Sequence, residues 1–251
     1  MSRQQAVLKI MGLNLHPVSM EDVHAFIDER VRTRQKALVL NLNIHCVCLA
    51  LREKWLAEMI NRAELVFCDG DGVRWGLKIL GQPVPPKITY DRWIWQLSEF
   101  AAAKGFSFYF LGGRPGVAKE AAERLKNRCP SLKILGEHHG HYDHAGEENQ
   151  KVVDEINRLK PDIVLMGFGM PLQEKWLLQN KERVDARIFL TGGAVFDYAA
   201  GKFKRAPEWM IQAHLEWFFR MLYDPKRLVK RYVMEIPYFF YRVFKEKLRL
   251  K

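Results

Sequence analysis

The chain has 251 residues, enough for one α/β domain with its own hydrophobic core and a small further module. Its 40 Lys and Arg exceed its 29 Asp and Glu, and the formal net charge of +11 favours an anionic partner. The excess is uneven, because residues 202–251 hold 13 Lys and Arg against 5 Asp and Glu.

The sequence also disfavours several classes of protein. Its four cysteines (Cys46, Cys48, Cys68 and Cys129) have no zinc-like or Cys-x-x-Cys spacing, which predicts unpaired thiols in a reducing compartment. No apolar run reaches the roughly 18 residues of a membrane-spanning helix, and no signal peptide is expected. We therefore expect an intracellular protein that meets a membrane, if at all, from the cytoplasmic side.

Along most of the chain, short apolar strands alternate with amphipathic helices. Strands are expected at residues 6–11, 36–41, 65–68, 107–111, 133–135, 162–166 and 187–190. Helices are expected at residues 23–33, 44–52, 53–62, 73–80, 92–104, 117–128, 147–159 and 173–180, the first capped by Ser19. This alternation predicts a Rossmann-like α/β fold, with a mostly parallel sheet covered by helices on both faces.

The remaining residues show no strand pattern. Helices are expected at residues 209–223, 226–236 and 238–250, with Pro237 dividing the last two. Cations alternate with aromatic side chains along this tail, as on a peripheral membrane surface. A surface for single-stranded nucleic acid, or an ordinary helical hairpin packed on the core, are the alternatives. The expected organisation is an α/β core at 1–200 and a basic helical appendage at 201–251.

Three glycine-rich corners follow strands of the predicted sheet. They lie at Gly112-Gly113-Arg114, at Gly167-Phe168-Gly169 and at Gly192-Gly193. Glycine lets the backbone approach an anion closely, and helix N-termini point N–H groups at it. Tight strand-to-helix turns need glycine anyway, but three such corners at one edge favour a phosphate-bearing ligand. None has the spacing of a dinucleotide or P-loop motif.

Asp69 and Asp71 follow the strand at 65–68, where catalytic carboxylates often lie in open sheets. The pair could bind a divalent metal, or Asp69 alone could be a general base; a solvated Asp-Gly turn is the plain alternative. Asn41, Asn43 and His45 follow the preceding strand and should lie beside Asp69. They could orient a polar ligand, or they could be a helix-capping Asn and a surface His.

In combination, these stretches resemble the TagA/WecG/CpsF family of bacterial glycosyltransferases (glycosyltransferase family 26). The resemblance spans roughly residues 41–232. Its pieces are Asn43-x-His45, Asp69-Gly70-x-Gly72-Val73, Phe110-Leu111-Gly112-Gly113-Arg114-Pro115, Gly167-x-Gly169-x-Pro171-x-Gln173-Glu174, Gly192-Gly193, Phe196-Asp197, Ala200-Gly201, Arg205-Ala206-Pro207, Leu215-Glu216-Trp217-x-x-Arg220 and Pro225-x-Arg227-x-x-x-Arg231.

The resemblance implies an inverting, metal-independent enzyme without a cofactor. It would move a sugar, commonly N-acetylmannosamine, from a UDP-sugar to a sugar on a polyprenyl diphosphate at the cytoplasmic membrane face, in cell-surface polysaccharide or teichoic acid synthesis. By resemblance Asp69 is the base, Gln173 lies in the active site, and Arg205 or Arg220 neutralises the leaving diphosphate. Arg227 and Arg231 are further expected substrate contacts. No nucleic acid partner is expected, and self-association is left open.

The chain departs from the family pattern at two places that face the donor or acceptor sugar. Family members tend to have Thr-x-Asn where this chain has Asn41-Leu42-Asn43, and Val-Thr/Ala-Gly-x-Asp-Leu where it has residues 88–93. Asp71 also replaces a usually apolar residue, which keeps a metal-dependent transferase using Asp69 and Asp71 as an alternative. A non-catalytic α/β protein that binds RNA or another polyanion is the alternative outside enzymes.

Overall fold

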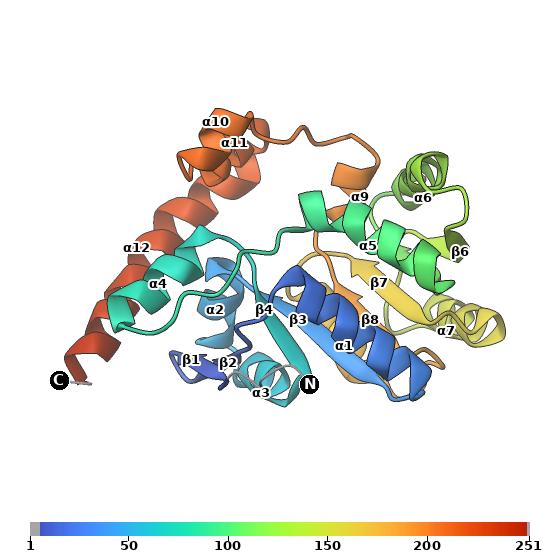
Figure 1. The fold of residues 1–251 in the computed structure, drawn as a ribbon, viewed down its shortest axis with the longest axis horizontal. Helices are drawn as coiled ribbons and strands as arrows, with labels where there is room; N and C mark the ends of the chain where they lie inside the picture. The colour runs from blue at the N-terminus through green and yellow to red at the C-terminus, as the bar shows by residue number, and fades with distance from the viewer. Residues whose placement is uncertain (1–5, 250–251) are drawn as a thin grey trace.

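The computed structural model of the chain describes residues 6–249, with the side chains of Tyr223, Lys226 and Arg227 left out. Its centre is a six-stranded parallel sheet in the order β4-β3-β8-β7-β5-β6 (Figure 1). The strands are β3 (Ala37–Leu42), β4 (Leu65–Cys68), β5 (Ser107–Gly112), β6 (Lys133–His138), β7 (Ile163–Gly167) and β8 (Ile188–Thr191). The predicted Rossmann-like α/β class is confirmed.

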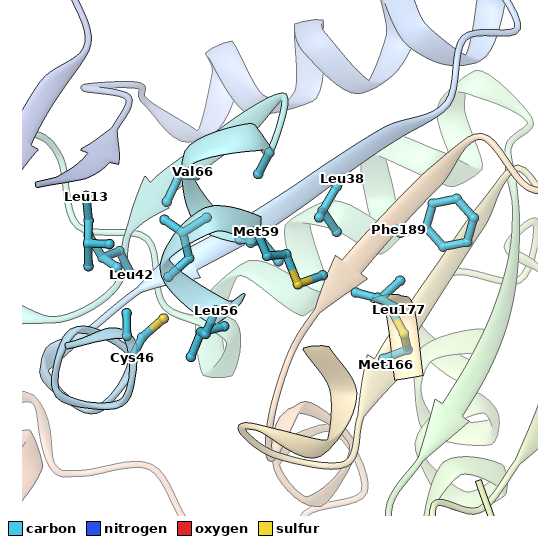
Figure 2. Close-up of a cluster of buried hydrophobic side chains, with 14 of the residues drawn as sticks. Leu13, Leu38, Leu42, Cys46, Leu56, Met59, Val66, Met166, Leu177 and Phe189 are labelled. Carbon is cyan, nitrogen blue, oxygen red and sulfur yellow. The ribbon is translucent and has the colours of Figure 1, made fainter. Parts of the chain in front are cut away.

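Helices cover both faces of the sheet and divide the core in two. One face carries α1 (Met20–Arg32), α5 (Tyr90–Lys104), α6 (Val117–Arg128) and α9 (Val195–Ala199). The other carries α2 (Ile44–Ala50), α3 (Lys54–Arg62), α7 (Glu147–Leu159), α8 (Leu172–Asn180) and, at its β4 end, α4 (Asp71–Leu80). Figure 2 shows side chains of this second, larger core, where Leu38 and Phe189 from the sheet meet Met59 and Leu177 from the helices.

The strand order creates a switch point at the carboxyl edge of the sheet. The connection from β5 to β6 runs one way along the sheet through α6, and that from β7 to β8 runs the opposite way through α8. Because such crossovers are right-handed, α6 and α8 lie on opposite faces. The neighbouring ends of β5 and β7 therefore flank the crevice in which ligands of open α/β sheets bind.

Local signals account for most helix boundaries. Ser19 accepts a hydrogen bond from the backbone N–H of Asp22, and the Asp22 carboxylate accepts one in return, which is the predicted capping of α1. Gly81 and Gly105 end α4 and α5 in the left-handed conformation, at φ 75° and 74°. The cysteines are free, as predicted, and three of the four are buried.

Near the N-terminus the structure differs from the expected single strand at 6–11. Two short strands, β1 (Leu8–Ile10) and β2 (Leu13–Leu15), form a separate antiparallel hairpin. Met11 and Gly12 have positive φ angles of 49° and 79°, which turn the chain between the strands. The five-residue helix α9 was also not predicted, because it is too short for a periodic pattern.

The tail is helical, but its helices divide at other places than predicted. The expected helix at 209–223 is two helices, α10 (Glu208–Gln212) and α11 (Glu216–Tyr223), separated by His214 at φ 58°. The expected break at Pro237 is wrong, because α12 (Pro225–Arg249) continues through it. The proline removes one backbone hydrogen bond, whereas the following turns bury Phe239 and Val243 in the larger core.

The helix α12 lies along α4 and α2 (Figure 1). A Cβ atom on Gly76 would come within 2.8 Å of the Phe239 ring, so this glycine gives the ring its space in α4. The backbone N–H of Met11 donates to Glu246 Oε2 at 2.9 Å, which ties the N-terminal hairpin to the same helix. The appendage thus shares its core with the α/β unit.

Candidate active site

Asp69 lies directly after β4 and is held by the neighbouring strand end. Asn41, the penultimate residue of β3, donates from Nδ2 to Asp69 Oδ2 at 2.7 Å, and Asn43 donates from Nδ2 to the same oxygen at 3.2 Å. The backbone N–H of Asp69 donates to the Leu42 carbonyl. Among the described residues, no hydrogen bond engages Oδ1. The arrangement thus fixes the carboxylate through Oδ2 and leaves Oδ1 for a ligand.

Asn43 is both a helix cap and a residue that orients a polar group, the two roles that its sequence position allows. Its Oδ1 accepts a hydrogen bond from the backbone N–H of Cys46 at 3.0 Å and caps α2. Its Nδ2 is then directed at Asp69. Asn41 is also fixed at both ends of its amide, because its Oδ1 accepts from the Thr191 hydroxyl at 3.3 Å.

Opposing electrostatic effects act on Asp69. Burial is the largest and raises the pKa of its carboxyl above the usual value. The hydrogen bonds from Asn43 and Asn41 and the positive charge of Arg220 counteract this, but the net shift is upward. A carboxylate with a raised pKa is a stronger proton acceptor than an ordinary aspartate, which suits a general base.

The glycine corners lie together at the switch point. The backbone N–H of Gly113 donates to the Gly167 carbonyl at 3.0 Å. A Cβ atom on Gly112 would lie 2.5 Å from the Gly167 backbone, and Gly112 has a φ of 148°. Only glycine permits this close approach of β5 and β7 at their carboxyl ends.

Three backbone amides of the glycine-rich corners have partners within the protein. Besides Gly113, the N–H of Gly192 donates to the Met166 carbonyl, and that of Gly193 donates to Gln173 Oε1 at 3.1 Å. A phosphate at this edge would therefore have to meet other donors or displace one of these contacts. Gly169 has a φ of 85° and begins the turn into α8, and the Arg114 side chain is exposed to solvent.

Gln173 links two of the corners from the first turn of α8. It is 0% exposed, and besides accepting from Gly193 it donates from Nε2 to Glu174 Oε1 at 2.7 Å. Glu174 is 2% exposed, and its Oε2 has no hydrogen-bond partner. Burial raises the pKa of Glu174 to about 7. Glu174 thus holds the Gln173 amide in one orientation.

Two tail arginines lie near each other, and one of them acts on Asp69. Arg220 of α11 lies over the Tyr198 ring, 5.7 Å from its centroid, and its charge acts on Asp69. Arg231 of α12 has its pKa lowered, chiefly by burial and also by repulsion from Arg220. Two neighbouring guanidinium groups are the kind of donors that bind phosphate oxygens bidentately.

The other predicted cations are placed differently. Arg205 is paired with Asp91 at 3.2 Å and with Glu208 at 3.5 Å, at the start of α5 and of α10. It is therefore less available for a diphosphate than Arg220. The Arg227 side chain lies outside the described part of the structure.

His45 does not contact Asp69, although sequence reasoning placed it there. Its Nδ1 lies 2.7 Å from Glu235 Oε1 of α12, and Arg231 contacts the other oxygen of the same carboxylate at 3.3 Å. Glu235 is buried, and burial raises the pKa of its carboxyl. The hydrogen bond and charge of His45 outweigh this effect, so the net shift is downward. His45 thus anchors the appendage beside the site.

Asp71 is engaged by basic side chains. Its carboxylate contacts Arg74 at 2.8 Å, Lys87 at 2.9 Å and His214 at 3.1 Å. Its oxygens are therefore engaged, and the expected alternative of a metal bridging Asp69 and Asp71 has no second available carboxylate. Within residues 6–249, no group of three or more His, Cys, Asp or Glu side chains could hold a metal.

Sequence reasoning missed several residues of the site. The charge of Asp69 acts on Tyr90 and Tyr198, Thr191 holds Asn41, and Glu235 positions His45. Tyr198 lies on the short helix α9, which gives no periodic signal. Glu235 is one of many charges in the tail, and only the packing of α12 against α2 distinguishes it.

Comparison with known proteins adds independent evidence. The model of a family described as "Glycosyl transferase WecG/TagA/CpsF family" matches residues 8–251. The chain is 27% identical over 250 residues to the N-acetylglucosaminyldiphosphoundecaprenol N-acetyl-beta-D-mannosaminyltransferase of Staphylococcus aureus strain MRSA252, a match that covers 98% of this chain and 95% of that relative. The enzyme of the same name from strain NCTC 8325 gives the same identity and coverage.

Proposed function

Because the chain belongs to the WecG/TagA/CpsF family of glycosyltransferases, we propose that it transfers a hexose from a UDP-sugar to a sugar carried on a polyprenyl diphosphate. The names of the staphylococcal relatives specify an N-acetylmannosaminyl group and an N-acetylglucosaminyl diphosphoundecaprenol acceptor. N-acetylmannosamine is the first candidate donor sugar here, and glucose or another hexose is the alternative. The product would enter cell-surface polysaccharide or teichoic acid synthesis.

The observation that carries the proposal is the geometry of Asp69. Two amides hold its Oδ2, and Oδ1 has no partner among the described residues. In a single displacement, the acceptor hydroxyl oxygen attacks C1 of the donor sugar and its proton passes to Oδ1. The bond between C1 and the diphosphate oxygen breaks, and UDP leaves with the electron pair. Attack opposite to the leaving group inverts the configuration at C1.

Departing UDP gains negative charge, which needs a cation in place before the bond breaks. Arg220 is the first candidate, because its charge already acts on Asp69 and no carboxylate pairs with it among the described contacts. Arg231 is the second, and its partner Glu235 holds it beside the site. Since these cations come from α11 and α12, the proposed site is complete only with the appendage docked.

The donor is proposed to lie along the carboxyl ends of β5, β7 and β8. The switch point between β5 and β7 supports this, because ligands of open α/β sheets bind there. Gly112 and Gly167 keep this edge free of side chains. A diphosphate reaching from these corners to Arg220 would present the sugar to Asp69.

A lipid-linked acceptor also requires a membrane surface. Large apolar side chains are exposed on α12 at intervals of three to four residues. Val229 and Val233 precede Pro237, and Tyr241, Phe244 and Leu248 follow it. Exposed cations, including Lys230 and Lys245, lie among them. We propose that this face of α12 docks on the cytoplasmic leaflet. None of the described helices is both long and apolar enough to cross a bilayer.

The first experiment is UDP release from a panel of UDP-sugars with a polyprenyl-diphosphate-linked N-acetylglucosamine, for wild type and Asp69→Asn. Asparagine keeps an oxygen that can accept from Asn41 but cannot take the proton. Acceptor-dependent release that falls by about 100-fold or more in the variant supports the proposal and identifies the donor. Equal release by both proteins would move the base elsewhere, and no release with any donor would refute the proposed reaction.

A further inference from the structure

Tyr90 is buried in the wall of the proposed active site. It is the first residue of α5 and is 6% exposed. Its ring packs against Phe67 of β4 and Trp93 of α5, with centroids 6.0 and 5.1 Å apart. The backbone N–H of Ile88 donates to the Cys68 carbonyl at 3.0 Å, which fastens this segment to the end of β4. The position of the tyrosine is therefore fixed by strand and helix together.

The Tyr90 ring lies on the same side of β4 as Asp69. Side chains alternate along a strand, so Asp69 leaves the chain on the same face as Phe67, the residue on which the Tyr90 ring packs. The charge of Asp69 also acts on Tyr90, because it adds to burial in raising the pKa of the phenol. Ring and carboxylate are thus neighbours on one side of β4.

The hydroxyl itself has no hydrogen-bond partner in the described structure, although it is buried. A buried tyrosine hydroxyl usually finds a partner, and one without a partner carries an uncompensated desolvation cost. A phenylalanine would fill the same space and make the same ring contacts without this cost. Packing therefore explains the ring of Tyr90 but not its oxygen.

We propose that the Tyr90 hydroxyl donates a hydrogen bond to an oxygen of the sugar held beside Asp69, and that Tyr90 is a specificity-determining contact. This inference rests on the proposed function, because it needs a sugar at Asp69. The oxygen belongs either to the acceptor sugar or to the donor sugar, since the base lies where the two meet. A sugar without that oxygen would leave the hydroxyl buried and unpaired, so the enzyme would discriminate against it.

The test uses the full chain with Tyr90→Phe, which removes only the oxygen. We expect kcat/KM to fall by about tenfold or more, with the thermal midpoint unchanged or slightly raised. Sugar analogues that each lack one hydroxyl identify the partner. With the analogue that lacks the contacted oxygen, wild type and variant should turn over equally. If this analogue is one of the donor sugar, Tyr90 contacts the donor. If it is one of the acceptor sugar, Tyr90 contacts the acceptor.

Tyr109→Phe is the matched control. Tyr109 is also buried, but its hydroxyl donates to Glu155 Oε2 of α7 at 2.8 Å. This variant should lose stability and keep its activity, the reverse of Tyr90→Phe. Wild-type turnover together with full activity of Tyr90→Phe on every substrate would overturn the Tyr90 inference alone. Absence of wild-type turnover would overturn the proposed function, and the inference with it.

Discussion

At the scale of single residues, Asn43 performs two tasks with the two ends of one amide. Its oxygen caps α2 and its nitrogen holds the Asp69 carboxylate. The sequence pattern indicated each task separately, because asparagine after a strand is typical of both a helix cap and a polar ligand contact. It could not show that one side chain performs both, since that depends on the register of β3 beside β4.

Asn43→Ser separates the two tasks. Serine caps a helix about as well as asparagine, so the free energy of unfolding should change by less than about 1 kcal/mol. It does not reach Asp69 with a donor, and loss of a hydrogen bond to the ionised carboxylate raises the pKa of Asp69. The acidic limb of kcat/KM against pH should therefore move to higher pH. A pH profile identical to that of wild type would contradict the proposed role of Asp69.

Asn43→Ala is the companion variant. It lacks both the cap and the donor, so it should show the same shift of the pH profile and an additional loss of stability of about 1 kcal/mol. Chemical denaturation of the two variants separates these effects. Equal stability of the serine and alanine variants would show that the cap contributes nothing.

Glu174 gives the fold a pH dependence that can be measured. Burial raises its pKa from 4.5 to about 7. The folded state thus keeps a proton that the unfolded state releases between these values, so the free energy of unfolding should fall as pH rises through this window. Glu174→Gln removes the ionisation and still accepts from Gln173. From pH 5 to pH 8 the free energy of unfolding of the variant should rise relative to that of wild type, by up to about 3 kcal/mol. Urea denaturation of both proteins measures this difference, and the same difference at pH 5 and at pH 8 would contradict the prediction.

At the scale of elements, packing overrides local signals where the two conflict. The core helices and strands follow from periodicity, caps and glycine stops, and their bounds are close to those predicted. Pro237 is the clear exception, because a proline signals a helix end but here lies inside α12. The burial of Phe239 and Val243 against α2 and α4 outweighs its cost, and no window of the sequence contains that contact.

Two phenylalanines of α12 test which face is buried. Phe239 is 0% exposed and Phe244 is 53% exposed. Phe239→Ala should lower the free energy of unfolding by about 3–5 kcal/mol, because it leaves a cavity beside Gly76. Phe244→Ala should change it by less than about 0.5 kcal/mol. Denaturant unfolding of both variants measures this, and equal losses would contradict the observed docking of the helix.

At the scale of the whole molecule, the uneven charge and the exposed apolar residues of α12 lie in the same part of the chain. The sequence indicated this appendage by its composition and its helical periodicity. It did not show how deeply α12 joins the core, because the contact between residues near 76 and 239 is set by the tertiary fold. For the same reason it misplaced His45, whose partner Glu235 is far away in sequence.

The protein should therefore sediment with vesicles that contain anionic lipid, and less so as salt rises. Phe244→Ala should weaken this binding, because it removes apolar area from the exposed face, while leaving UDP release in detergent unchanged. Lys119→Gln, an exposed substitution on α6 of the core, is the control for general charge loss and should bind as wild type. Equal vesicle binding by the Phe244 variant would assign the membrane contact to another surface.

The bond between the Met11 backbone and Glu246 joins positions 235 residues apart, and α12 covers helices that were made much earlier. At a synthesis rate of about 5–20 residues per second, α2 and α4 wait roughly 10 to 40 s on the ribosome for Phe239 and Val243 to be added. Their apolar faces are uncovered throughout that time. A nascent chain that has not yet reached Phe239 and Val243 therefore exposes apolar surface that chaperones can bind.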